Sequence, residues 1–70
     1  MSQHPTITLN GTPHPIAAAL TLAQLLETLG LADKPVVIEL NQQAIFPRDY
    51  AHIMVEHGAR VEIVTLAAGG

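Results

Sequence analysis

The chain has 70 residues, of which 49% are apolar, and this predicts one small folded domain rather than a disordered segment. Its net charge is −3 and its only fixed cations are Lys34, Arg48 and Arg60, too few for a nucleic-acid-binding surface. Cysteine is absent, which excludes disulfides and thiol chemistry. No apolar stretch reaches the roughly 18 residues of a membrane span. The first residues do not form a basic segment that leads into an apolar run, the pattern of a targeting sequence. We therefore expect a soluble cytoplasmic protein without nucleic-acid or membrane partners.

A β-hairpin is the first predicted element. Residues 6–10 (TITLN) alternate between apolar and polar side chains, which is typical of a half-buried strand. Asn10 and Gly11 then favour the two positive φ angles of a tight turn. The returning strand contains Pro13 and Pro15, which lack an N–H donor, so it is predicted to lie at a sheet edge.

A helix is predicted over residues 21–30 (TLAQLLETLG). Thr21 followed three residues later by Gln24 forms a capping-box pattern, and Gly30 is placed to end the helix in a left-handed conformation. One helix face carries an apolar stripe at i, i+3, i+4 and i+7: Leu22, Leu25, Leu26 and Leu29. This stripe predicts the main hydrophobic contact between helix and sheet.

Three further strands are predicted after the helix. They cover residues 35–41, a short segment at 44–47 and the last strand at 60–66, with a connector over 48–58 that has room for one helical turn. The final strand is expected beside the first, in the middle of a mixed sheet. The predicted fold class is α+β: a ubiquitin-like β-grasp with four to five strands and one main helix packed on one face.

The last predicted strand has apolar residues on both faces. Alternate residues of a strand point to opposite sides, so Glu62, Val64 and Leu66 share the face that the helix leaves uncovered. Exposed apolar side chains often mark a contact surface, and these three residues are the predicted partner surface. The alternative is that neighbouring residues or dimerisation cover them.

The chain ends in four small residues: Ala67, Ala68, Gly69 and Gly70. Extended, they reach roughly 13 Å beyond the predicted domain at 1–66. Glycine has no Cβ, so a Gly-Gly end fits a slot too narrow for other residues. This favours a flexible tail, residues 67–70, that enters another protein's active site. The alternative is a frayed end that happens to be small.

With these features the sequence resembles the ubiquitin-like sulfur carriers, and among them the ThiS family. The resemblance covers essentially the whole chain and is most specific at four residues of ELNQQAIFPRDY and at the Gly-Gly end. The four residues are Asn41, Gln42, Pro47 and Arg48. The sequence departs from the family pattern at His57 and Ala59, where acidic residues are usual, and in its two prolines at 13 and 15.

The resemblance implies that the chain is a protein co-substrate rather than an enzyme. The resemblance implies that a ThiF-type enzyme uses ATP to adenylate Gly70, and that a persulfide donor then converts this terminus to a thiocarboxylate. The thiocarboxylate would deliver sulfur to the thiazole synthase ThiG in thiamin biosynthesis. The resemblance also implies that the chain binds no cofactor or metal and needs no catalytic side chain.

Two alternative functions are compatible with the sequence: a MoaD-like small subunit of molybdopterin synthase, and a ubiquitin-like binding module with an inert tail. An enzyme is disfavoured, because no Ser/His/Asp set has a signature spacing. The four histidines show no metal-ligand spacing and are predicted to be solvated: His4, His14, His52 and His57. Arg48 is predicted to pair with Asp49 or a nearby carboxylate, with a partner contact as the alternative, and Asn41 to form a turn.

Overall fold

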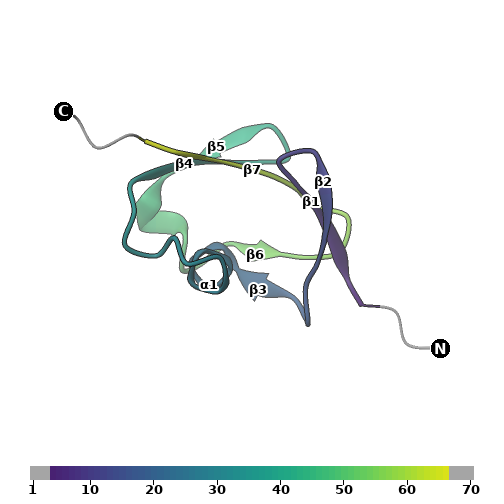
Figure 1. Ribbon diagram of the computed structural model, residues 1–70. Helices are drawn as coiled ribbons and strands as arrows, with labels where there is room; N and C mark the ends of the chain where they lie inside the picture. The colour runs from purple at the N-terminus through teal and green to yellow at the C-terminus, as the bar shows by residue number, and fades with distance from the viewer. Residues whose placement is uncertain (1–3, 67–70) are drawn as a thin grey trace.

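The computed structural model describes residues 4–66, which fold into two layers (Figure 1). One layer is a five-stranded sheet; the other holds the helix and a two-stranded sheet. The elements in chain order are β1 (Thr6–Leu9), β2 (Thr12–Pro15), β3 (Leu20–Thr21), α1 (Leu22–Thr28), β4 (Val36–Leu40), β5 (Gln43–Ile45), the 3₁₀-helix η1 (Pro47–Asp49), β6 (Met54–Val55) and β7 (Arg60–Thr65).

The large sheet has the strand order β2-β1-β7-β4-β5. Its central strand β7 runs parallel to β1 and antiparallel to β4, so the first and last strands of the chain lie side by side. α1 covers one face of this sheet, and no described element covers the other (Figure 1). The predicted β-grasp with a mixed sheet is therefore confirmed, as is the edge position of the proline-containing strand β2.

Local sequence signals set both ends of α1. The Thr21 hydroxyl accepts a hydrogen bond from the Gln24 N–H, and the Gln24 side chain accepts one from the Thr21 N–H, as the capping box predicts. At the other end Gly30 has φ 73°, and the N–H of Leu31 donates to the carbonyl of Leu26 over 2.8 Å. This is a Schellman motif, which satisfies carbonyls that the helix itself leaves unpaired.

Both hairpins of the large sheet turn on two residues with positive φ. Asn10 and Gly11 have φ 50° and 82°, and Asn41 and Gln42 have φ 51° and 70°. These are the angles of type I′ turns, which match the twist of the flanking strands. Asn and Gly adopt them readily, whereas Gln42 has a long side chain and is strained in the left-handed region.

We expect Gln42→Gly to stabilise the protein by about 0.5–1 kcal/mol, because glycine has no Cβ to clash at positive φ. The measurement is the free energy of unfolding from urea titration. Gln43→Gly is the matched control. Gln43 is the next residue and lies in strand β5, so the same substitution there should destabilise the protein by a similar amount. Equal effects at both positions would contradict the strain at residue 42.

The core lies between the two layers. Its buried residues are Ile7, Ile16, Leu22, Leu25, Leu26, Ile38, Tyr50, Val55, Val61 and Ile63. Three of the four stripe leucines are buried, and Leu29 is only partly buried because it caps the helix end. Tyr50 is the one aromatic residue among these buried residues, and it is 9% exposed. Its hydroxyl is buried and has no hydrogen-bond partner among residues 4–66.

Tyr50→Phe is expected to stabilise the domain by about 1 kcal/mol, since it removes a buried hydroxyl that lacks a partner. Burial also raises the pKa of the Tyr50 phenol above its ordinary value of 10.0. The folded state therefore holds this proton more tightly than the unfolded state, and stability is lost as the pH rises above about 10. Thermal melts should show that Tyr50→Phe loses less stability than the wild-type protein as the pH rises above about 10. Phe46→Tyr, at an exposed ring, is the control. It should change neither the stability of the protein nor the loss of stability at alkaline pH.

The segment predicted as a connector, residues 48–58, is more ordered than expected. It begins in η1 and then contributes β6, which pairs with β3 just before the helix. The N–H of Leu22 also donates to the carbonyl of Ile53 over 2.9 Å. These bonds fasten the start of α1 and place Val55, which is fully buried, in the core.

Candidate functional site

The predicted partner surface lies on the uncovered face of the large sheet. Glu62, Val64 and Leu66 are all exposed, with exposed fractions of 59% for Val64 and 50% for Leu66. Val37 of β4 is the Cα partner of Val64 and is 46% exposed, so the two valines lie side by side across the sheet. The sequence analysis did not single out Val37, although its position between two inward residues was a readable signal.

Phe46 extends the apolar surface at the end of β5. It is 62% exposed and its backbone is extended, so its side chain lies on the opposite side from that of Ile45, as Val37 does from Ile38. We call Val37, Phe46, Val64 and Leu66 the docking face. Several exposed apolar side chains on one sheet face form a surface suited to contact with another protein.

Arg48 is held by this phenyl ring. Its guanidinium carbon lies 5.1 Å from the centre of the Phe46 ring, a cation–π contact. The predicted ion pair with Asp49 or a nearby carboxylate is wrong for the part of the chain that the structure describes, residues 4–66. The physical reason is that the short η1 turn brings Arg48 back over Phe46, two residues earlier.

The docking face borders two carboxylates. Glu39 on β4 and Glu62 on β7 are Cα partners in the antiparallel ladder, and both side chains are exposed. Like charges directly opposite each other destabilise a sheet slightly. Within the described range neither carboxylate forms an ion pair, so this border presents concentrated negative charge beside apolar side chains.

The central strand β7 is anchored along its length before the chain enters the predicted tail. The Asn10 side chain makes two hydrogen bonds to the backbone of Ile63: its amide oxygen accepts over 2.8 Å and its amide nitrogen donates over 3.1 Å. On the other edge, the N–H of Leu66 donates to the carbonyl of Pro35 over 2.9 Å. The last described residue, Leu66, is thus fixed to the sheet. The predicted tail residues lie outside the described range: Ala67, Ala68, Gly69 and Gly70.

Asn41 forms a turn, as predicted. Besides its positive φ, its side-chain oxygen accepts a hydrogen bond from the N–H of Arg60 over 2.9 Å. Of the histidines, His57 has a structural role that the sequence analysis missed: its Nδ1 accepts a hydrogen bond from the N–H of Thr6 over 3.0 Å. This bond joins the turn before β7 to the start of β1, and no local sequence signal announces it.

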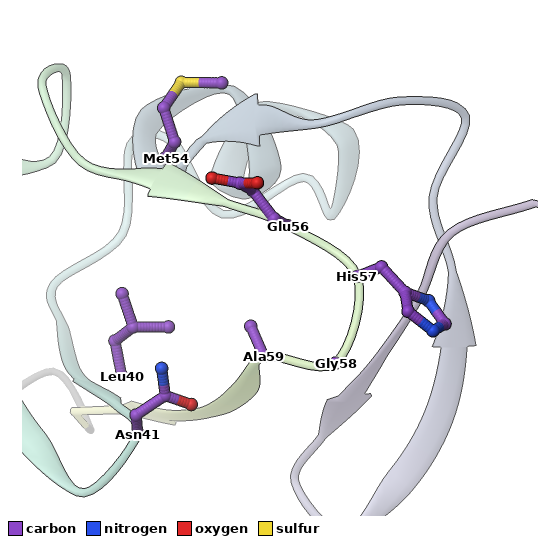
Figure 2. Close-up of a pocket in the computed structure, with 7 residues that line it drawn as sticks. All are labelled: Leu40, Asn41, Met54, Glu56, His57, Gly58 and Ala59. Carbon is purple, nitrogen blue, oxygen red and sulfur yellow. The ribbon is translucent and has the colours of Figure 1, made fainter.

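A pocket of about 280 Å³ lies at the beginning of β7, lined by Leu40, Asn41, Met54, Glu56, His57, Gly58 and Ala59 (Figure 2). Figure 2 shows the imidazole of His57 turned away from the pocket, consistent with its bond to Thr6. The ionisable side chains in the lining are His57, which is bonded to Thr6, and Glu56, which has no partner among the described residues. The polar side chain of Asn41 is bonded to the N–H of Arg60. The pocket is about 20 Å along β7 from Leu66, and its residues supply no acid–base pair.

No group of three or more metal-ligating side chains is present among residues 4–66. In that same stretch, α1 is too short and not apolar enough to cross a bilayer, and no other α-helix occurs. The described residues offer an apolar face, an acidic border and a fixed strand β7. Such a combination is suited to contact with another protein.

Comparisons with known proteins agree with this geometry. The model of the ThiS family matches residues 7–70. A crystal structure of the thiamine biosynthesis protein ThiS from Geobacter metallireducens superposes with a TM-score of 0.80 at 29% identity, covering 93% of this chain and 99% of that one. A solution structure of a thiamine biosynthesis protein from the same organism gives 0.79, also at 29% identity, and covers 93% and 87%.

A longer relative is a thiazole synthase of Paramagnetospirillum magneticum, 31% identical over 64 residues. The match takes in 91% of this chain but only 20% of that protein, so the chain spans about a fifth of the relative's length. Fold, sequence and the extent of the family match coincide, and the chain belongs to the ThiS family.

Proposed function

We propose that this protein is a sulfur carrier of thiamin biosynthesis whose reactive group is the carboxylate of Gly70. The observation that carries the proposal is that the ThiS family model matches through residue 70, including the Gly-Gly pair. The fixed end of β7 supports it, because a terminus that enters another active site needs a rigid body behind it. Glycine at the last two positions leaves the carboxylate unhindered.

The proposed chemistry takes place in partner enzymes. A carboxylate oxygen of Gly70 attacks the α-phosphorus of ATP, pyrophosphate leaves, and an acyl-adenylate forms. The terminal sulfur of a protein persulfide then attacks the acyl carbon and AMP leaves. In the resulting acyl disulfide, a second thiol attacks the cysteine sulfur of the persulfide protein, not the sulfur bonded to the Gly70 acyl carbon. It forms a new disulfide there and releases the Gly70 thiocarboxylate. The chain acts as co-substrate: it supplies no catalytic side chain, and ATP is bound by a ThiF-type adenylating enzyme.

The docking face gives that enzyme its place of attachment. Val37, Phe46, Val64 and Leu66 would bury their exposed surface against it, and the acidic border at Glu39 and Glu62 would meet a basic residue of the partner. Leu66 belongs to this face and directly precedes residue 67. Docking here therefore brings the tail to the enzyme without any rearrangement of the body.

We further propose that thiazole synthase, ThiG, receives the sulfur. The support is the relative from Paramagnetospirillum magneticum, a protein named thiazole synthase, one fifth of which resembles this chain. A carrier-like domain and a thiazole synthase therefore occur within one polypeptide in that organism. When two domains are joined in one chain, the effective concentration of one for the other is high, which suits a donor and its acceptor.

Intact-mass spectrometry tests the proposal. The protein is incubated with ATP, a ThiF-type enzyme and a persulfide donor, and the expected result is the mass gain of exchanging one oxygen for one sulfur. A variant lacking Gly70 and a variant with one alanine appended after Gly70 are the controls, and neither should gain mass.

The same experiment separates the alternatives. Modification only by the adenylating enzyme of the molybdopterin pathway would favour the MoaD-like function. No mass gain with either enzyme would overturn the carrier function and favour a binding module with an inert tail.

A further inference from the structure

We propose that the open edge of β7 at Thr65, together with an apolar pocket beside it, binds an extended segment of the protein that adenylates Gly70. The segment would add to the large sheet as a short strand, in line with β1 and beyond its end. This inference rests on the proposed carrier function and names a second contact of the same partner, separate from the docking face.

The hydrogen-bond pattern of β7 shows that this edge is open. In an antiparallel pair, alternate residues point their N–H and C=O groups toward the partner strand. Toward β4 these are the even-numbered residues: Leu66 donates to Pro35, and Arg60 accepts from Asn41. The N–H and C=O of Thr65 therefore point away from β4, toward the side where β1 lies.

β1 ends before it reaches Thr65. Its last backbone bond to β7 is donated by the Asn10 N–H to the carbonyl of Val61, over 2.9 Å. Asn10 then turns the chain away at φ 50°, and its side chain takes the place of a strand residue by bonding both backbone groups of Ile63. Beyond that point no described residue pairs with Thr65 on this edge. A sheet edge in this state can pair with another chain.

A pocket lies where the next inward side chain of an added strand would point. It is lined by Leu9, Asn10, Leu29, Leu31, Ile63 and Thr65 and has a volume of about 290 Å³. Its leucines come from the end of β1, the end of α1 and the residue after Gly30, and all three are only partly buried. Strand addition uses two elements, backbone hydrogen bonds for affinity and a side-chain pocket for specificity, and both occur together here.

The place of Thr65 in the chain indicates the occupant. Residue 67 follows Thr65 by two positions, and an extended tail places Gly70 within roughly 13 Å of Leu66. A protein that acts on Gly70 therefore lies close to this end of β7, where the unpaired edge and the pocket are available to it. The pocket calls for an aliphatic side chain, such as leucine or isoleucine, on that segment. A second copy of this chain is the competing occupant.

Amide hydrogen exchange by NMR, with a ThiF-type enzyme as the added protein, tests the proposal. We expect exchange of the Thr65 amide to slow by at least about tenfold in the complex, since a new backbone hydrogen bond protects it. Thr65→Pro removes the donor from an edge position that tolerates proline, and should raise the KM for adenylation about tenfold. Thr65→Ala keeps the N–H and changes only a side chain that lines the pocket, so it should raise the KM less than Thr65→Pro does. Circular dichroism checks that each variant folds.

Each outcome decides a different question. If wild-type protein is adenylated while exchange at Thr65 is unchanged, or if Thr65→Pro and Thr65→Ala have equal KM values, strand addition is overturned and the carrier function stands. If the Thr65 amide is protected without enzyme and sedimentation shows a dimer, a second copy occupies the edge and the inference is overturned. If wild-type protein forms no adenylate, the carrier function itself fails.

Discussion

Leu25→Ala should remove most of the folding free energy of this protein. Leu25 is completely buried at the centre of the helix–sheet contact, and truncation of such a leucine costs about 2–5 kcal/mol because it removes apolar contacts and leaves a cavity. A domain of 70 residues without disulfides has a total stability of only about 3–5 kcal/mol. Urea titration followed by circular dichroism should therefore show a variant that is partly unfolded even without denaturant.

Glu27→Ala is the matched control for this result. Glu27 lies two residues away on the same helix, is exposed, and its replacement by alanine keeps a high helix propensity. Its free energy of unfolding should stay within about 0.5 kcal/mol of wild type. A loss below about 1 kcal/mol for Leu25→Ala would show that the Leu stripe is not the main contact between the layers.

Val64→Lys has the opposite expected profile: a large loss of function with little loss of stability. In the proposed complex, Val64 would be buried against the adenylating enzyme, and a lysine there removes apolar contact and places a charge in a desolvated interface. We expect kcat/KM for adenylation to fall at least about tenfold, which corresponds to 1.4 kcal/mol. In the free protein Val64 is 59% exposed, so unfolding should change by about 1 kcal/mol at most.

Two further variants make this prediction specific to the docking face. Val37→Lys, at the Cα partner of Val64, should reduce adenylation to a similar degree. Ala17→Lys adds the same charge at an exposed residue near the helix, outside the docking face, and should be modified at the wild-type rate. Equal rates for all three variants would mean that the enzyme does not dock on this face.

The elements that local sequence signals specify were predictable. The Thr21–Gln24 capping box, the Gly30 helix end and the Asn10-Gly11 turn each depend on residues that are adjacent or three apart. For such features the chemistry of one or two side chains decides the backbone conformation, and the structure confirms all three. The central position of β7 followed from general rules of strand connection rather than from its own residues.

Features that depend on distant residues were not predictable. β3 and β6 have two residues each, too few for any periodicity, and they form only because the chain brings them together. The burial of Tyr50 likewise depends on its packing among core residues from other elements of the fold. In each case tertiary packing decides between local options of similar energy.

The candidate site also contains features that were predictable from the sequence and features that were not. The exposure of Glu62, Val64 and Leu66 follows from strand alternation and is confirmed, whereas their role in partner binding stays a prediction. The tail, residues 67–70, lies outside the described range and its proposed reactivity stays a prediction. The open edge at Thr65 was hidden from the sequence analysis, because it depends on where β1 ends relative to β7.

The parallel pairing of β1 with β7 also governs how the protein responds to mechanical force. A pull on Leu66, with the body held at the start of β1, acts along the two strands, so their hydrogen bonds are loaded in shear and must break together rather than one after another. The two bonds from Asn10 to Ile63 lie in the same line of load. A molecular machine that drags this chain by its last residues therefore meets the most resistant part of the fold first.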